Sequence, residues 1–253
     1  MDLGLADRVY VLTGASRGLG YATAECLVAE GAKVVVSSRD PEKVASAVQR
    51  LGGDPHAAGL AVDLADPDGP RRLVDGAVDR FGRLDGALVS VGGPPRGTAL
   101  QATDEQWRAA FESVFLGAVR TARAVVDRLT GGGVIGFVLS SSARVPIEGL
   151  GISNGLRPGL LGVAKDMADE LGPRGIRVVS LLPHRVLTDR NIELFAATGD
   201  PEKARRDSEA AIPLRRIAEP AEFGRIAAFL LSPAAGYLTG LAVAVDGGAI
   251  RAL

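Results

Sequence analysis

The sequence predicts a single α/β domain in which a doubly wound, parallel sheet of seven strands has helices on both faces. Short runs rich in β-branched residues alternate with longer segments of helical periodicity along almost the whole chain. Some of these strands contain a run without alternation, such as Lys33-Val34-Val35-Val36, which is typical of strands covered on both faces. The composition changes nowhere along the chain, so we expect one domain over residues 1–253.

Four strands and three helices are expected in the first part of the chain. Each strand is a short apolar run bounded by glycine or polar residues, and each helix repeats apolar residues three or four positions apart. The strands are predicted at residues 9–13, 33–38, 57–62 and 86–91, and the helices at 19–30, 41–51 and 70–81.

The alternation continues in the second part of the chain with longer helices. Strands are predicted at residues 134–140, 177–182 and 242–246, and helices at 104–129, 156–171 and 220–231. Residues 188–212 follow the sixth strand and are too polar for the core. We expect this segment to form a helical flap over the ends of the strands.

Composition and charge exclude several functional classes. With 47% hydrophobic and 23% charged residues, the chain can bury a core and is not disordered. A formal net charge of −1 gives no general attraction to nucleic acid or to an anionic membrane. No apolar run reaches the roughly 20 residues needed to span a bilayer. A single cysteine cannot form an internal disulfide or a cysteine-based metal cluster, and no metal site is expected.

Two features of composition bear on location and origin. An acidic residue, Asp2, stands where a secretion signal would place a basic cluster, so a cytoplasmic protein is expected. Of the 29 basic residues only Lys33, Lys43, Lys165 and Lys203 are lysines. This excess of arginine suits a GC-rich bacterial genome.

A glycine-rich turn follows the first predicted strand and opens the first helix. Glycines at such a turn let the backbone approach a pyrophosphate, while the N–H groups and positive dipole end of the helix N-terminus favour its negative charge. The strand–turn–helix context therefore predicts a dinucleotide site of the Rossmann type. The residues expected to contact the cofactor here are Gly14, Ser16, Arg17, Gly18, Leu19 and Gly20.

Residues at the end of the second strand favour NADP(H) over NAD(H). An NAD site usually places a carboxylate here to hold the ribose 2′-hydroxyl, whereas a 2′-phosphate requires a cation. Ser38 occupies the position of the acid, Arg39 follows it, and Arg17 could add a second positive charge. The negative charge of Asp40 would disfavour a 2′-phosphate nearby. However, Asp40 directly precedes Pro41 and therefore also fits the N-cap of the next helix. Alternatively, Arg39 is a solvated surface charge.

These motifs resemble those of the short-chain dehydrogenase/reductase family, and in particular of its 3-oxoacyl carrier-protein reductases. The similarity covers almost the whole chain and includes Asp63-Leu64 after the third strand, where the adenine edge is expected. It implies a Rossmann-type fold, NAD(P)-dependent hydride transfer between a carbonyl and an alcohol, a small-molecule substrate and a homo-oligomer, either a tetramer or a dimer. Further cofactor contacts are implied for Ser90, Gly92, Pro183 and Thr188.

The resemblance also locates the family's catalytic serine, tyrosine and lysine, and two of the three are replaced. The serine position is Ser140, with Ser141 and Ser142 as neighbouring alternatives, whereas Ser153 stands for the tyrosine and Arg157 for the lysine. A serine hydroxyl is a far weaker acid than a phenol. Arg157 could still hydrogen-bond the nicotinamide ribose, but it remains protonated and cannot relay a proton as lysine can. We therefore expect an atypical active site.

Other side chains could supply the missing acid. His184 follows the sixth strand, and an ordinary pKa of about 6.5 suits proton transfer, although it could equally be a loop histidine packed beneath the flap. Glu148 and Asp189 are further candidates. We expect the three tyrosines to pack in the fold instead of replacing the catalytic one: Tyr10, Tyr21 and Tyr237.

Three functional hypotheses follow from these residues. The first is an atypical NADP(H)-dependent oxidoreductase in which Ser140, Ser153 and Arg157 replace the usual set. The second is a protein that binds NADP(H) with little or no redox turnover and acts as a regulator or an inactive partner. The third is a non-redox enzyme of the same fold that uses His184 as acid or base.

Overall fold

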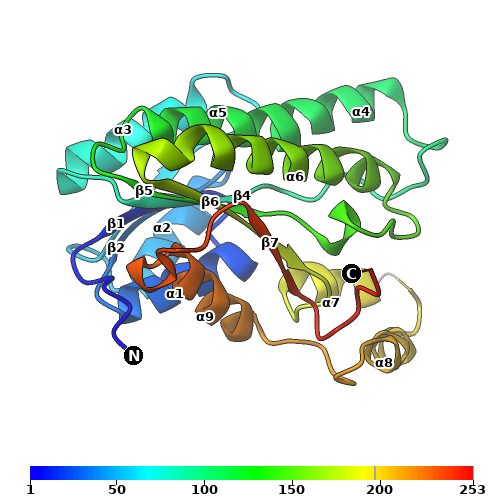
Figure 1. Cartoon of the computed structure of the whole chain (residues 1–253). Helices are drawn as coiled ribbons and strands as arrows, with labels where there is room; N and C mark the ends of the chain where they lie inside the picture. Colours follow the sequence, from blue (N-terminus) through cyan, green and yellow to red (C-terminus); the bar gives the residue numbers. More distant parts are fainter. Residues whose placement is uncertain (197, 253) are drawn as a thin grey trace.

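The computed structural model describes residues 1–196 and 198–252, and it confirms the α/β fold class (Figure 1). Within these residues, seven parallel strands form one sheet in the order β3–β2–β1–β4–β5–β6–β7. The order reverses between β1 and β4, so consecutive crossovers place helices on opposite faces of the sheet. This switch point is where a doubly wound sheet leaves a crevice at the carboxyl ends of its strands.

The strands lie within two residues of their predicted bounds. Central strands are apolar throughout because both of their faces are covered: Val11 of the first strand is fully buried and pairs with Val35 on one side and Ala87 on the other. The bounds are β1 (Val9–Leu12), β2 (Lys33–Ser38), β3 (Ala57–Ala61), β4 (Gly86–Ser90), β5 (Gly133–Val138), β6 (Ile176–Pro183) and β7 (Leu241–Val245).

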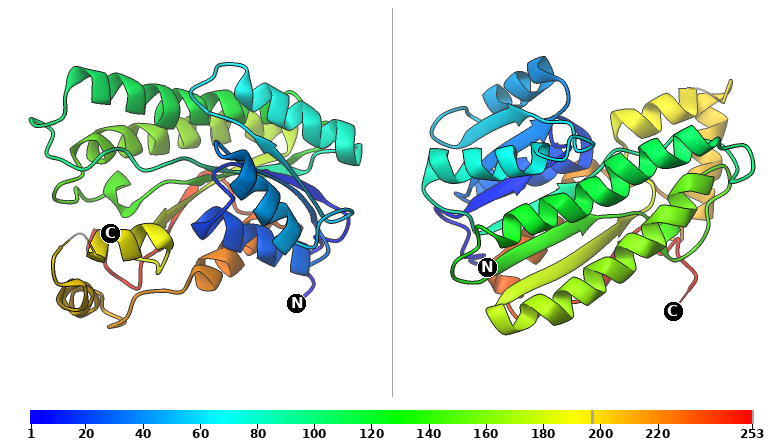
Figure 2. Two further views of the ribbon diagram at one scale, coloured as in Figure 1. Left: turned by 180° about the vertical axis from the view of Figure 1, so that it is seen from behind. Right: turned by 90° about the horizontal axis from the view of Figure 1, so that it is seen from above.

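Helices cover the two faces of the sheet, each over its own apolar core (Figures 1 and 2). One face carries α3 (Gly69–Phe81), α4 (Asp104–Ala110), η1 (Phe111–Leu116), α5 (Gly117–Val126) and α6 (Gly151–Leu171). The opposite face carries α1 (Gly18–Ala29), α2 (Pro41–Arg50) and α9 (Pro220–Leu231). Short 3₁₀ turns are η2 (Ser141–Ala143), η3 (Gly172–Arg174) and η4 (Pro233–Ala235).

Helix α6 begins five residues earlier than the sequence predicts. Gly151 and Pro158 discourage the prediction of a helix here, but the backbone N–H of Gly151 donates to the carbonyl of Gly97 at 2.9 Å and fixes the first turn. Consequently Ser153 and Arg157 lie on the same helix, four residues apart, and both are buried.

The segment 188–212, predicted as a flap, contains two helices beyond the carboxyl ends of β6 and β7 (Figure 1). They are α7 (Asp189–Ala196) and α8 (Pro201–Ala211). Phe195 of α7 forms a small apolar cluster with Ile212 and Ile217, separate from the two main cores. This part of the chain therefore has few apolar contacts with the sheet, as a movable element would require.

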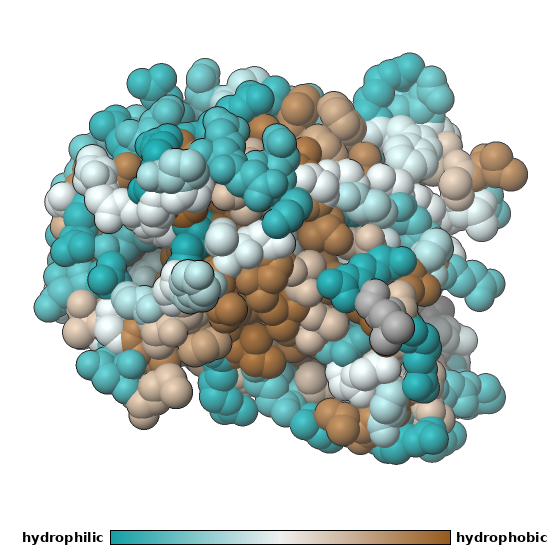
Figure 3. Space-filling view, viewed as in Figure 1, coloured by the Kyte–Doolittle hydropathy of each residue, from teal (hydrophilic) through white to brown (hydrophobic). Residues whose placement is uncertain are grey.

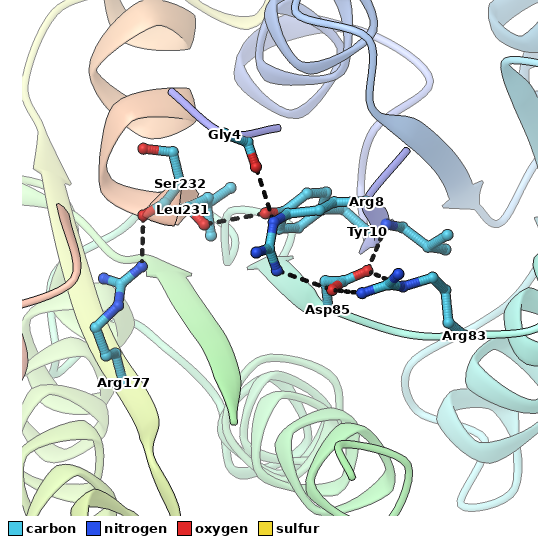
Figure 4. Close-up of polar contacts among 9 residues, drawn as sticks. Gly4, Arg8, Tyr10, Arg83, Asp85, Arg177, Leu231 and Ser232 are labelled. Atoms are coloured by element: carbon cyan, nitrogen blue, oxygen red, sulfur yellow. Dashed lines mark hydrogen bonds and ion pairs between the residues drawn. The ribbon is translucent and has the colours of Figure 1, made fainter. Parts of the chain in front are cut away.

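A polar network around the buried Asp85 lies at the opposite end of the sheet, where β1 and β4 begin (Figure 4). The carboxylate of Asp85 accepts hydrogen bonds from Arg8 at 3.0 Å, from both guanidinium ends of Arg83, and from the backbone N–H of Val9. The hydroxyl of Tyr10 donates to the carbonyl of Leu231, and burial raises the pKa of this phenol. Tyr10 is therefore a packing residue far from the crevice.

The last strand, β7, leaves apolar surface exposed at the sheet edge, and Figure 3 shows an apolar patch over this region. Leu241, Ala242 and Val243 are only half-buried. Tyr237 is fully exposed, so the prediction that it packs is wrong: no further strand covers the turn that precedes β7. No helix in the described part of the chain is long and apolar enough to cross a membrane.

Candidate functional site

Two adjoining cavities open at the carboxyl ends of the strands. Cavity A has a volume of about 570 Å³ and cavity B of about 530 Å³, and they share lining residues that include Gly14, Ser90 and Gly92. Apart from the alternatives Ser141, Ser142 and Glu148, the sequence-predicted site residues line one or both cavities: Gly14, Ser16, Arg17, Gly18, Leu19, Gly20, Ser38, Arg39, Asp63, Leu64, Ser90, Gly92, Ser140, Ser153, Arg157, Pro183, His184 and Thr188.

The turn after β1 requires glycine on steric grounds. Gly14 has φ of +58°, and a Cβ there would lie 2.7 Å from the carbonyl oxygen of Ser90. A Cβ on Gly20 would lie 2.8 Å from the carbonyl oxygen of Gly14, so glycine brings α1 close to the turn. No side chain caps the N-terminus of α1. Its first N–H groups can therefore bind an anion such as a pyrophosphate.

Cavity A contains the residues on which the choice between NADP(H) and NAD(H) depends. Ser38 and Arg39 line it together with Asp63. Asp40 caps α2 by accepting from two backbone N–H groups, and its carboxylate also pairs with Lys43 at 2.8 Å. The predicted N-cap is thus confirmed, and Lys43 balances the charge of Asp40.

Arg17 connects the glycine turn to the flap. Its Nη1 lies 3.2 Å from a carboxylate oxygen of Glu193 and 3.5 Å from one of Asp189, both on α7. Thr188 lies against the same turn, since a Cβ on Gly18 would be 3.7 Å from its methyl group. Arg17 was expected to face a 2′-phosphate, but here acidic residues that are remote in sequence compete for its charge.

Asp189 lines cavity B, as proposed for an additional acid, whereas Glu148 lines neither cavity.

The three consecutive serines have three different partners. Ser140 accepts a hydrogen bond from the backbone N–H of Ser142 at 3.1 Å, which leaves its own hydroxyl hydrogen available to donate. The Oγ atoms of Ser142 and Ser153 are 2.9 Å apart, and both residues are buried. Ser141 is also buried, with its Oγ 3.0 Å from Nδ1 of His184. Of these serines, Ser140 and Ser153 line cavity B.

Arg157 is a buried cation without a carboxylate partner among the described residues. Its side chain donates to the backbone carbonyls of Val138 at 3.1 Å and of Gly92 at 3.3 Å, and its Nε is buried with no hydrogen-bond partner. Burial lowers the pKa of this guanidinium to about 10. Arg157 therefore remains positively charged at neutral pH and keeps one N–H group unused.

His184 is half-buried with one ring nitrogen engaged. Because Nδ1 contacts Ser141, the second nitrogen, Nε2, has no partner in the described part of the chain and is exposed at cavity B. Burial and the neighbouring Arg185 lower the pKa of His184, although Asp246 opposes the shift. The imidazole is thus mainly neutral near pH 7.

Comparison with known proteins identifies the family. A family model described as enoyl-(acyl carrier protein) reductase matches residues 14–249. Dehydrogenase/reductase SDR family member 4 of Homo sapiens is 34% identical over 249 residues, which cover 96% of this chain and 88% of that protein. The chain belongs to the short-chain dehydrogenase/reductase family.

Two solved members of this short-chain dehydrogenase/reductase family are similar over the full length of both chains. L-sorbose reductase from Gluconobacter frateurii, complexed with NADPH and L-sorbose, superimposes with a TM-score of 0.95 at 31% identity. A short-chain oxidoreductase from Pseudomonas aeruginosa, described as containing an atypical catalytic center, has a TM-score of 0.90 at 28% identity. These relatives confirm the prediction of an NAD(P)-dependent oxidoreductase.

Several lining residues of this short-chain dehydrogenase/reductase were missed by sequence reasoning. Most lie in loops, where no periodicity indicates which way a side chain points, and two, Asn191 and Leu194, lie in α7. Gly93, Pro94, Arg96, Leu150, Val186, Asn191 and Leu194 all line cavity B. No group of three or more His, Cys, Asp or Glu side chains in residues 1–196 and 198–252 is placed to hold a metal ion.

Proposed function

We propose that this short-chain dehydrogenase/reductase is an NADP(H)-dependent enzyme that reduces the carbonyl group of a small molecule or oxidises the corresponding alcohol. Ser140, Ser153 and Arg157 would replace the family's serine, tyrosine and lysine. One observation carries the proposal: these three side chains and His184 line a single cavity that adjoins the glycine turn. NADPH bound there supplies a hydride for reduction, and NADP⁺ accepts one in the reverse direction.

The residues present fit the cofactor. The tight turn that Gly14 and Gly20 permit and the uncapped N-terminus of α1 suit a pyrophosphate. Arg39 beside Ser38 suits a 2′-phosphate, and no carboxylate occupies the end of β2. The unpartnered Nε of Arg157 is a buried donor that a ribose hydroxyl or a substrate oxygen would satisfy.

Ser140 is the residue we assign to polarise the substrate oxygen. Its oxygen accepts one hydrogen bond from the N–H of Ser142, and its hydroxyl hydrogen is free to donate to a substrate oxygen in cavity B. Ser153 shares its hydrogen bond with Ser142 inside the wall of the cavity and is shorter than a tyrosine. A fixed donor at the oxygen that becomes negative lowers the barrier, and the charge of Arg157 acts in the same direction.

His184 is the side chain we assign to deliver the proton. Its Nε2 is exposed at the cavity, and the hydrogen bond between Nδ1 and Ser141 holds the ring in place. Because the pKa of His184 is lowered, the protonated ring is scarce near pH 7. Reduction is therefore expected to be slow at neutral pH and faster in mild acid.

The proposal is tested by cofactor titration and by turnover. Calorimetry should show NADPH binding at least tenfold more tightly than NADH, and a ketone panel should reveal NADPH oxidation that Ser140→Ala slows at least tenfold. Ser46→Ala on the exposed face of α2 is the matched control and should retain wild-type activity. Absence of NADPH binding would refute the assignment, whereas binding without turnover would favour a non-redox role.

We further propose a homo-oligomer, a dimer or a tetramer, in the cytoplasm. The half-buried apolar side chains of β7 support an interface at that sheet edge (Figure 3). Light scattering after size exclusion would decide between these states and a monomer.

A further inference from the structure

The glycine turn after β1 is held from outside the two cavities by a side chain of α2. Nη2 of Arg50, the last residue of that helix, donates to the backbone carbonyl of Ser16 at 3.0 Å. Among the described residues this is the one hydrogen bond that the side chain of Arg50 makes. Arg50 lines neither cavity, so its contact with the turn is separate from the cofactor contacts proposed above.

Tyr21 of α1 fixes the direction of the Arg50 side chain. The guanidinium carbon lies 4.0 Å from the centre of the Tyr21 ring, and this ring is itself buried in the core that α1 and α2 share. A cation over the face of an aromatic ring is attracted to it. Side chains on a helix also lean toward its N-terminus, so Arg50 extends back from the end of α2 toward the turn. Two different contacts, a ring and a carbonyl, therefore hold one guanidinium.

The direction of the Ser16 carbonyl determines the direction of the next N–H group. A peptide bond is planar and trans, so the carbonyl of Ser16 and the N–H of Arg17 point in opposite directions. Because Arg50 draws the carbonyl toward α2, the N–H of Arg17 points away from α2. This N–H makes no hydrogen bond within the described part of the chain. Since Ser16 and Arg17 both line cavity A, the geometry leaves a free donor directed at that cavity.

The turn meets cavity A beside the residues proposed to select NADP(H). The N–H of Ala15 donates to the carbonyl of Ser37 at 2.9 Å, which attaches the turn to the end of β2. Ser38 and Arg39 follow directly and line the same cavity. A backbone N–H donates well to an anionic oxygen, as a guanidinium does. The free donor of Arg17 is thus on the side of the cavity where a 2′-phosphate is proposed.

We propose that Arg50 is a positioning residue for cofactor selectivity: by holding the carbonyl of Ser16, it directs the N–H of Arg17 at the 2′-phosphate of NADP(H). The inference rests on the proposed function and adds a residue that contacts no part of the cofactor. The N-terminus of α1, which is proposed to bind the pyrophosphate, does not depend on this contact. Loss of Arg50 should therefore weaken the binding of NADPH and spare that of NADH.

Calorimetry with the two cofactors tests the proposal without requiring turnover. In Arg50→Met, which keeps the length of the side chain and removes its donors, Kd for NADPH should rise about fivefold or more. Kd for NADH should stay within about twofold of the wild type, since NADH has no 2′-phosphate. Arg50→Lys keeps a cationic donor and should recover most of the NADPH affinity. A merely structural role for Arg50 would weaken the binding of both cofactors alike.

A second pair of ligands isolates the phosphate from the rest of the cofactor. Adenosine 2′,5′-bisphosphate should lose affinity in Arg50→Met as NADPH does, whereas adenosine 5′-monophosphate should not. Tyr21→Leu removes the ring beneath the guanidinium and should act in the same direction, while Tyr21→Phe keeps the ring and should resemble the wild type.

Two control variants separate position from charge. Gln49→Met changes the exposed neighbour of Arg50 on α2, and Arg123→Met removes an exposed positive charge on α5. Both should bind the four ligands as the wild type does. Circular dichroism and thermal unfolding establish that each variant is folded.

The outcomes separate this inference from the proposed function. An unchanged Kd for NADPH in Arg50→Met, an equal loss for NADPH and NADH, or no recovery in Arg50→Lys would each overturn the positioning role and leave the proposed function standing. If the bisphosphate binds in an Arg50-dependent manner but NADPH does not bind, the positioning role survives and the NADP(H) assignment fails. Absence of binding by both 2′-phosphate ligands would overturn the two together.

Discussion

Replacing Arg157 by methionine should weaken cofactor binding and leave the free energy of unfolding nearly unchanged. A pKa lowered from 12.5 to about 10 corresponds to a burial penalty of about 3 kcal/mol for the charged form. The hydrogen bonds to Val138 and Gly92 are 3.1 and 3.3 Å long and offset this penalty by about 1.5 kcal/mol each. These contributions nearly cancel. The variant without ligand should therefore be as stable as the wild type to within about 1 kcal/mol, or roughly 2–4 °C in Tm.

The same change should weaken the response to NADPH. At a ligand concentration of 100 times Kd, the wild type gains about 2.7 kcal/mol of stability. Loss of a charged donor weakens binding by about tenfold or more, which reduces this gain to about 1.4 kcal/mol or less at the same concentration. Thermal unfolding with and without NADPH measures both quantities, with Arg123→Met as the control. A fall in Tm above 10 °C without ligand, or an unchanged response to NADPH, would refute this reasoning.

Three further changes probe separate parts of the structure. Arg39→Glu should weaken NADPH binding at least tenfold and spare NADH; an unchanged ratio in calorimetry would remove Arg39 from the 2′-phosphate site. His184 has a lowered pKa, so kcat/KM for reduction should rise as the pH falls below 6.5, and His184→Gln should abolish this rise; an unaltered pH profile would contradict the assignment. Asp85→Asn breaks the network with Arg8 and Arg83 and should cost about 3 kcal/mol, roughly 6–12 °C in Tm. A fall below 2 °C would show that the network contributes little.

The scaffold was predictable because its determinants are local. The glycine turn follows a strand and opens a helix. Close backbone contacts at Gly14 and Gly20 leave no room for a Cβ, so the glycines in the sequence already indicate this turn. Continuous apolar runs such as the three valines at 34–36 indicate strands buried on both faces. Asp40 before Pro41 identified a helix N-cap correctly.

What the sequence could not reveal depends on contacts between distant segments. The predicted helix 104–129 contains the π-helical turn η1 in place of regular α-helix, and no pattern of apolar residues signals this extra residue per turn. Pairing of Arg17 with Asp189 and Glu193 joins residues more than 170 positions apart.

The most direct test of the central claim is hydride transfer itself. NADPH carrying deuterium at the reactive nicotinamide carbon is incubated with the protein and with a panel of anionic and neutral ketones, and the products are analysed by mass spectrometry. The account predicts deuterium on the carbinol carbon of a product, at a rate at least tenfold lower in Ser140→Ala than in the wild type or in Ser46→Ala. Tight NADPH binding with no deuterium in any product would contradict a redox role for this site.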